Sequence, residues 1–187
     1  MGADYEDVTV FGLSGEREAT LLAKQTEAVF MWTNADGDAV GVVMNYVFHG
    51  GSFWLTGSGQ RKRFAALRRR PRAAVAITSR GTDIGVSQSV TYKGDVVLHD
   101  DAATKAWFFP ALAERQRRGD DAGAKAEFLR RLDTPTRVVI ELAPVRWITY
   151  DGNRLEAALR GVEYHDRLAK RSRNLTTPPA GVEMTTF

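Results

Sequence analysis

The sequence predicts a mainly β protein, built as a small closed or split barrel of six to seven antiparallel strands with a few peripheral helices. Asp36-Gly37 and Gly50-Gly51 stand between apolar runs, and such dipeptides are strong signals for β-hairpins. Residues 88 to 98 alternate apolar and polar side chains, as a half-buried strand does. A barrel is favoured because closure removes the exposed edges of so many antiparallel strands.

The first part of the chain predicts one short helix followed by three strands. Ser14 is a suitable N-cap, and Glu16 stands in the first turn after it, where a helix favours acidic residues. Apolar runs then predict strands over residues 28 to 34, 39 to 48 and 52 to 56. Because tight turns separate these runs, we expect the three strands to pair antiparallel in sequence order.

Strands and helices alternate in the second part of the chain. Strands are predicted over residues 72 to 79, 88 to 98, 136 to 142 and 145 to 150, with a bulge or bend at Gly94. Between them, residues 101 to 132 predict a pair of amphipathic helices. Asp100 or Asp101 would cap the first helix, and Pro110 would kink it or begin a new one.

The length of 187 residues and a hydrophobic content of 43% fit one compact domain. We assign residues 15 to 152 to the barrel domain, residues 1 to 14 to an N-terminal segment, and residues 153 to 187 to a partly flexible C-terminal extension. The formal net charge is only +3, so bulk charge does not favour a nucleic-acid-binding protein.

Composition also narrows the chemistry and the cellular setting. The absence of cysteine excludes disulfides, thiolate nucleophiles and cysteine-ligated metals. The acidic N-terminus lacks a signal-peptide profile, and no apolar run reaches the roughly 20 residues that span a bilayer. We therefore expect a cytoplasmic protein that does not bind membranes. Its arginine- and alanine-rich composition suggests a bacterial source.

Residues 52 to 72 carry the most informative pattern in the chain. An apolar strand leads into a turn of small residues, followed by Arg61, Lys62 and a basic helix closed by Pro71. Free backbone N–H groups and the helix dipole make such a helix start attractive to anions, and the two cationic side chains add to this. The pattern predicts a phosphate-binding site.

Two known phosphate motifs do not match this turn. A dinucleotide-binding fingerprint needs a third glycine where Lys62 stands, and it needs a parallel sheet rather than hairpins. A P-loop needs Ser or Thr after its lysine, whereas Arg63 follows Lys62. Phosphate binding on an antiparallel scaffold remains.

The order of these features resembles the pyridoxamine 5'-phosphate oxidase-like flavin and deazaflavin oxidoreductases, which are FMN-binding split barrels. The resemblance covers roughly residues 15 to 150. It rests on the hairpins, Phe53-Trp54-Leu55-Thr56, Arg61-Lys62, Leu67, Pro71-Arg72 and residues 90 to 94. It implies a homodimer that binds FMN or the deazaflavin coenzyme F-420 at the subunit interface.

The resemblance also implies roles for individual residues. Arg61 and Lys62 would hold the cofactor phosphate, assisted by Ser58 and Gln60. The isoalloxazine ring would lie along five strand residues, namely Val42, Val43, Met44, Leu55 and Thr56. Gln88 and Ser89 fall where the partner subunit contributes polar contacts. The end of the last strand, residues 146 to 152, lacks the Arg- and His-containing segment that grips the substrate of pyridoxamine phosphate oxidases, which argues against vitamin B6 oxidation.

No catalytic acid or base is assigned, although Tyr46, Tyr92 or His49 would serve as a proton donor if it faced the flavin. His49, His99 and His165 show no metal-binding spacing, so no metal site is predicted. Trp54 and Trp147 are interpreted as packing residues.

The function expected from the resemblance is hydride transfer between FMN or F-420 and a small unsaturated or quinone-like substrate. Two alternatives stay open: a non-catalytic flavin or deazaflavin carrier, or a haem-binding protein of the same fold. A more distant one is an arginine-rich nucleic-acid binder, since residues 68 to 70 and Arg72 could contact nucleic acid or the acidic tail of a deazaflavin.

Overall fold

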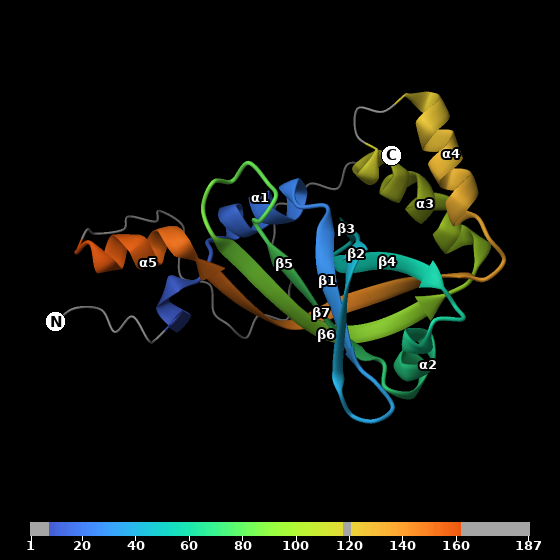
Figure 1. The fold of residues 1–187 in the computed structure, drawn as a ribbon, viewed down its shortest axis with the longest axis horizontal. Coiled ribbons are helices and arrows are strands. Elements are labelled where there is room, and N and C mark those ends of the chain that lie inside the picture. The colour runs from blue at the N-terminus through green and yellow to red at the C-terminus, as the bar shows by residue number, and fades with distance from the viewer. Residues whose placement is uncertain (1–7, 118–120, 162–187) are drawn as a thin grey trace.

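Seven antiparallel strands form one curled sheet in the computed structural model, which describes residues 8–117 and 121–161 (Figure 1). The strand order across the sheet is β2-β1-β5-β6-β7-β4-β3. The strands are β1 (Glu27–Thr33), β2 (Ala39–Asn45), β3 (Val47–His49), β4 (Ser52–Ser58), β5 (Arg72–Thr78), β6 (Gln88–His99) and β7 (Arg137–Asp151). The predicted class, a mainly β split barrel of six to seven strands, is confirmed.

Helices lie around the ends of this sheet. They are a 3-10 turn η1 (Val8–Phe11), α1 (Gly15–Lys24), α2 (Lys62–Arg69), α3 (Ala102–Gln116), α4 (Ala122–Leu132) and α5 (Gly152–Leu159). Ser14 caps α1 as predicted, because its Oγ accepts the backbone N–H of Arg17 at 3.3 Å. Helices α3 and α4 stand together near the ends of β4 and β7, whereas α5 lies at the other end of the molecule (Figure 1).

The barrel interior is filled by aromatic and aliphatic side chains from every long strand. Phe30, Tyr46, Phe53 and Tyr92 are all fully buried there. The rings of Phe53 and Tyr92 are 4.7 Å apart, and those of Tyr46 and Phe53 are 5.5 Å apart. Of these four residues, Tyr92 belongs to the strand that alternation predicted over residues 88 to 98.

The strand expected over residues 39 to 48 is two strands, and this prediction was wrong. The chain leaves the ladder at Tyr46, so that β2 pairs with β1 at one edge of the sheet and β3 pairs with β4 at the opposite edge. Tyr46 is turned into the core, where its hydroxyl donates to the Leu22 carbonyl at 3.1 Å. Consequently β4 pairs with β7 rather than with β2, and the three early strands are not consecutive neighbours.

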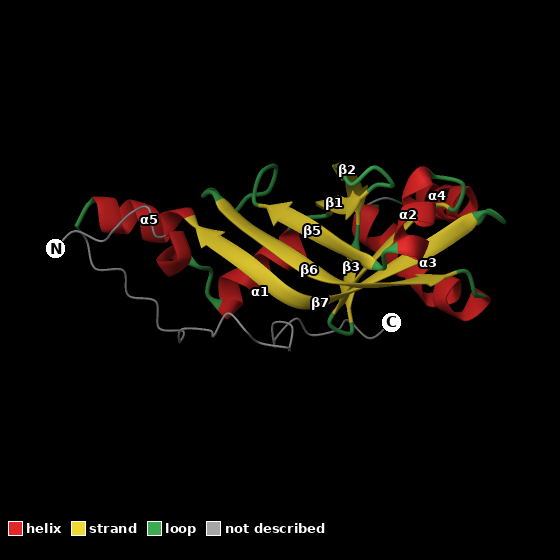
Figure 2. Cartoon of the chain, turned by 90° about the horizontal axis from the view of Figure 1, so that it is seen from below, coloured by secondary structure: helices red, strands yellow, loops and turns green. Residues whose placement is uncertain are grey.

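The two strands expected over 136 to 142 and 145 to 150 are a single strand, β7. The strand continues through Pro144, although proline has no backbone N–H to donate, because a β-bulge lies there. At this bulge the register with β6 shifts between Lys93 and Gly94, and Gly94 faces Pro144. The bulge predicted at Gly94 is confirmed. Strands β6 and β7 form the longest ladder of the sheet, and α5 extends beyond one end of it (Figure 2).

The predicted pair of helices is confirmed as α3 and α4. Asp101 is the N-cap of α3, and that helix continues through Pro110, so the prediction that Pro110 could begin a new helix was wrong. The pair covers the outer side of β3, β4 and β7, with Phe108, Phe109, Leu112, Leu132 and Val139 forming a second buried cluster. Trp54 packs there against Trp107, and Trp147 packs against Tyr92, as the packing interpretation expected.

Some predictions fall on other parts of the chain. Residues 1 to 7, and the tail of residues 171 to 187, lie outside the described residues, as does His165. Within residues 8–117 and 121–161, no helix combines the length and apolar character that crossing a membrane requires.

Candidate functional site

The predicted phosphate-binding turn joins β4 to α2 and is fastened to the start of β7. The backbone N–H of Gly59 donates to the Thr136 carbonyl at 2.7 Å, and the N–H of Arg61 donates to the Ser58 carbonyl at 3.0 Å. The hydroxyl oxygens of Ser58 and Thr136 are 3.4 Å apart. These bonds define the shape of the turn from Ser58 to Lys62, which we call the phosphate turn.

Gly59 allows the phosphate turn to approach β7 this closely. A Cβ at this position would lie 3.0 Å from Cγ2 of Val138 and 3.2 Å from the Thr136 carbonyl oxygen. Both contacts are tighter than ordinary van der Waals separations, so a side chain would push the turn away from β7. The small residue that the sequence shows before Gln60 is therefore required by packing.

Two exposed cations stand at the beginning of α2. Arg61 is the N-cap residue, and its side chain makes no capping hydrogen bond. Neither Arg61 nor Lys62 takes part in any ion pair within the described ranges, and both side chains are exposed. Unneutralised cations beside an uncapped helix start are suited to holding a phosphate.

Arg63 is a third cation at the start of α2, and its guanidinium lies on the core-facing side of β4, where a terminal nitrogen is 3.4 Å from the point that a Cβ on Gly57 would occupy. Its guanidinium carbon lies 5.8 Å from the centre of the Trp32 ring, and its Nε is shielded from solvent without a hydrogen-bond partner among the described residues. Burial, and secondarily the charge of Arg61, lowers the pKa of Arg63. The sequence shows only another arginine in a basic run, so this environment becomes visible in the tertiary structure alone.

The end of β4 supplies the other residues predicted near the phosphate turn. Thr56 Oγ1 donates to the Val138 carbonyl at 2.8 Å, which directs this side chain along β7. Gln60 is exposed and Ser58 is partly buried beside Thr136. Leu55 is fully enclosed in the barrel core, so only its backbone is available to a ligand. The structure thus brings Thr56, Ser58, Gln60, Arg61 and Lys62 together.

The predicted ring-binding residues on β2 face in different directions. Met44 is buried in the barrel, and Val42 packs partly against the same core. Val43 points outward, with 63% of its surface exposed. Strand β2 is at one edge of the sheet, whereas β4 is next to the opposite edge. The β2 residues therefore belong to a different side of the barrel from the phosphate turn, which follows β4.

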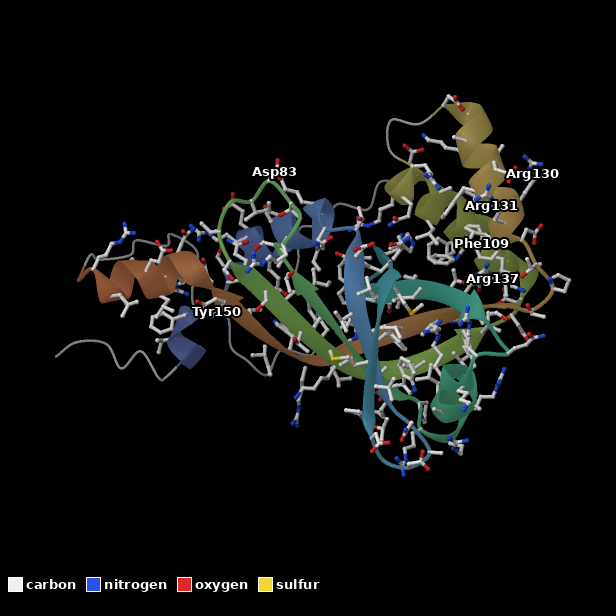
Figure 3. The ribbon with its side chains drawn as sticks, viewed as in Figure 1. Asp83, Phe109, Arg130, Arg131, Arg137 and Tyr150 are labelled. Atoms are coloured by element: carbon white, nitrogen blue, oxygen red, sulfur yellow. The ribbon has the colours of Figure 1, made fainter. Side chains whose placement is uncertain are left out.

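Gln88 and Ser89 lie far from the phosphate turn of their own chain. Ser58 pairs with Arg137 at the start of β7, whereas Ser89 pairs with Tyr150 near its end. Figure 3 shows Arg137 and Tyr150 at opposite ends of the molecule. Thirteen residues of strand separate these positions, which corresponds to about 40 Å. One chain by itself does not unite the predicted residues.

A row of small and apolar side chains crosses the outer face of five strands. The row is continuous because its members are consecutive cross-strand partners: Val43, Val29, Ala76, Thr91 and Ile148. Val43 and Ile148, at its two ends, each have 63% of their surface exposed. We call these five residues the outer row. It adjoins Ser89, whose register lies two residues along β6 from Thr91.

The residues considered as proton donors are engaged elsewhere. The hydroxyls of Tyr46 and Tyr92 are buried and donate to the Leu22 carbonyl and to Glu18. The ring of His49 lies 4.7 Å from that of Trp107, under α3. Neither tyrosine is therefore available to a ligand at the phosphate turn.

His99 and the acidic residues near it form a structural network. His99 Nε2 lies 2.9 Å from Glu141, which also accepts the Ser52 hydroxyl at 2.9 Å. Among the described residues, no group of three or more histidine and acidic side chains could hold a metal ion. Among the side-chain groups considered above in the described part of the chain, the cationic turn has the composition of an anion site.

Several solved structures share this fold. A conserved hypothetical protein of Mycobacterium tuberculosis superposes with a TM-score of 0.66 at 17% identity, covering 82% of this chain and 91% of its own. A structure titled F420 reductase gives a TM-score of 0.51 at 17% identity, covering 69% of this chain and 94% of its own. A heme binding protein from Mycobacterium smegmatis gives 0.52 at 23% identity, covering 76% and 60%.

Sequence comparison places the chain more specifically. No curated protein matches it. The sequence profile of the family described as pyridoxamine 5'-phosphate oxidase matches residues 16–151, which include every strand and the phosphate turn. The chain therefore belongs to the pyridoxamine 5'-phosphate oxidase family.

Proposed function

We propose that this protein is an oxidoreductase that binds FMN, or alternatively coenzyme F-420, and transfers a hydride between that cofactor and a small unsaturated or quinone-like substrate. The observation that carries the proposal is the phosphate turn, where Arg61 and Lys62 stand exposed and without ion-pair partners in the described chain. A cofactor phosphate would supply the missing negative charge.

The residues of the phosphate turn would have different roles in binding the cofactor phosphate. Arg61 and Lys62 would neutralise the phosphate, while the hydroxyl of Ser58 and the amide of Gln60 would direct its oxygens. The bound flavin would supply the hydride chemistry at its own ring. The chain's contribution is to orient that ring and to exclude water, and Val43 is the proposed side-chain contact on β2, since Val42 and Met44 face the barrel core.

The site is proposed to be completed by a second copy of the chain. A strand length of about 40 Å separates Ser89 from the phosphate turn of its own chain, so Gln88 and Ser89 would act at such a turn across a subunit interface. The outer row offers an apolar surface for such an interface, beside Ser89. We therefore propose a homodimer in which each site takes its phosphate turn from one protomer and Ser89 from its partner.

FMN is the preferred cofactor, and F-420 is the alternative. The structure titled F420 reductase shares the fold, which keeps a deazaflavin in consideration. The acidic tail of F-420 would extend from the phosphate turn toward the exposed arginines of α2, of which Arg68 is one. FMN carries no such tail. An Arg68→Ala change would therefore weaken F-420 binding and leave FMN binding unaltered.

Absorbance of the purified protein, followed by titration, tests this function. A flavin spectrum, a deazaflavin band, a haem Soret band or no chromophore would each point to a different occupant. Titration of the cofactor-free protein with FMN and F-420 should show saturable binding of one of them. Saturable binding of neither would refute the proposal.

Lys62→Ala examines the turn directly. Because charge-assisted hydrogen bonds contribute roughly 1.5 to 3 kcal/mol, this change should weaken cofactor binding about tenfold to a hundredfold. The fold should be retained, since Lys62 is exposed. Unchanged affinity would remove Lys62 from the site.

A non-catalytic flavin or deazaflavin carrier, or a haem-binding protein, is the second candidate. We retain this candidate because the chain shares its fold with the heme binding protein from Mycobacterium smegmatis. A Soret band in the purified protein would support it. A bound flavin that no quinone or enone substrate oxidises would support the carrier. We also propose a cytoplasmic, bacterial protein, in keeping with its composition.

A further inference from the structure

Lys93 and Arg146 are two exposed cations that lie directly opposite one another on β6 and β7, and we call them the cation pair. Opposite residues of antiparallel strands project from the same face, so the cation pair belongs to the outer face of the sheet, which also carries the outer row. Like charges directly opposite one another destabilise a sheet. An anion bound at the cation pair would remove this repulsion.

The described chain supplies no negative charge to the cation pair. None of the ion pairs within residues 8–117 and 121–161 includes Lys93 or Arg146. Asp95 is the next residue along the same face of β6, and its carboxylate is already paired with Arg72 at 3.1 Å. The cation pair is therefore available to an anion from outside the described chain.

The β-bulge lies immediately beside the cation pair. Lys93 faces Arg146 and Gly94 faces Pro144, so Val145 is the extra residue of β7 between them. A bulge bends its strand and increases the local twist, which changes the direction of neighbouring side chains. The backbone of β7 approaches Gly94 so closely that a Cβ there would lie 2.0 Å from a carbonyl oxygen. The cation pair is thus carried on two closely packed strands rather than on a loop.

An apolar surface adjoins the cation pair on the side toward Ser89. Thr91 and Ile148 of the outer row lie two residues away along each strand, and 63% of the surface of Ile148 is exposed. Ser89, which is proposed to reach the cofactor site of the partner, lies on the same face of β6, and the rise from Ser89 to Lys93 is about 13 Å. A flat molecule beside the cofactor ring would lie over Thr91 and Ile148 and present an acidic group to the cation pair.

We propose that the cation pair binds an acidic group of the substrate, so that the protein acts on a flat, unsaturated or quinone-like acid rather than on a neutral molecule. This inference rests on the proposed function and on its homodimer, in which Ser89 of one protomer reaches the cofactor site of the other. Lysine and arginine donate charge-assisted hydrogen bonds to an acidic group, and the planar guanidinium suits bidentate contact. The cation pair is separate from the phosphate turn, which would hold the cofactor.

The rival explanation is that the cation pair meets an acidic side chain of the second protomer and only supports the homodimer. The two explanations predict different effects of Arg146→Met, which keeps a long side chain and removes its charge. A role in the subunit interface predicts a weaker dimer and equal losses of affinity for charged and uncharged ligands. A role in substrate binding predicts an unchanged dimer and a loss confined to anionic ligands.

The experiment measures the dissociation constants of 1,4-naphthoquinone-2-sulfonate and of uncharged 1,4-naphthoquinone for the oxidised, cofactor-loaded protein. The two probes share one ring system and differ in the acidic group. Arg146→Met and Lys93→Met should each weaken binding of the sulfonate about tenfold, which corresponds to about 1.4 kcal/mol, and leave binding of the uncharged quinone unaltered. Arg80→Met, which changes an exposed arginine in the loop between β5 and β6, is the control and should bind both probes as the wild type does.

Two further measurements separate the explanations. Analytical ultracentrifugation of the same proteins should show that neither variant at the cation pair changes the oligomeric state. For the wild-type protein, a tenfold increase in NaCl concentration should weaken binding of the sulfonate and leave the uncharged quinone unaffected, because salt screens exposed charges.

Three results would overturn the inference while leaving the cofactor function intact. They are unchanged sulfonate binding by both variants, binding of neither quinone by the cofactor-loaded protein, and a dissociated dimer with parallel losses for the two probes. Absence of saturable binding of FMN and of F-420 would overturn the inference together with the proposed function.

Discussion

The Gly94→Ala substitution tests whether β6 and β7 lie as close together at the bulge as the structure shows. A Cβ at this position would lie 2.0 Å from the Ala143 carbonyl oxygen and 2.7 Å from its carbon. Ordinary contact requires about 3.5 Å, so the strands would have to separate by roughly 1.5 Å at the bulge. Both clashing atoms belong to backbone, which cannot rotate away.

We expect Gly94→Ala to lower the free energy of unfolding by about 4 kcal/mol, the range of severe core disruptions. This is a large part of the 5 to 15 kcal/mol that typical domains possess. Urea denaturation would show it as a midpoint lowered by about 2 M, for a slope near 2 kcal/mol/M. The neighbouring Lys93→Ala is the control, and its exposed side chain should matter by less than about 0.5 kcal/mol. A Gly94→Ala protein within about 1 kcal/mol of the wild type would refute the reasoning.

Three further predictions concern buried groups. Burial raises the pKa of Tyr46 to about 12, so the unfolded chain loses the Tyr46 proton at lower pH than the folded protein does. The free energy of unfolding should therefore fall by about 2 to 3 kcal/mol between pH 10 and 12. Urea denaturation of Tyr46→Phe should not show this fall. Leu55→Ala should cost about 2 to 5 kcal/mol by calorimetry, since Leu55 is fully enclosed. Asp151→Ala removes a buried carboxylate that lies 2.5 Å from Arg17, and urea denaturation should show a cost of about 3 kcal/mol. A cost under about 1 kcal/mol would contradict a structural ion pair.

Much of the candidate site could be predicted because it is local in sequence. Strand, small-residue turn, cation pair and helix follow one another between residues 52 and 72, and the structure keeps them in contact. Turns and helix termini depend on residues only a few positions apart, so they can be predicted without knowledge of the fold. Arg63 escaped notice because its distinguishing contact, with Trp32, joins segments about thirty residues apart.

Errors in the fold arose where tertiary pairing outweighed local pattern. The apolar run from residues 39 to 48 fits a single strand, but Tyr46 is buried inside the barrel and its hydroxyl donates to the Leu22 carbonyl, which interrupts the strand. The strands expected over residues 136 to 142 and 145 to 150 are one strand, because a bulge opposite Gly94 accommodates Pro144. The proton-donor hypothesis for Tyr46 and Tyr92 failed for a related reason, because burial decides whether a hydroxyl is available.

The sequence by itself determined the alternation of the strands, the caps of the helices and the phosphate turn, because each depends on neighbours within a few residues. Only the tertiary structure decided that β2 and β3 lie at opposite edges, and that Ser89 stands a whole strand away from Ser58. Those outcomes depend on which distant surfaces pack best, and pairing between strands far apart in the chain leaves no local record in the order of residues.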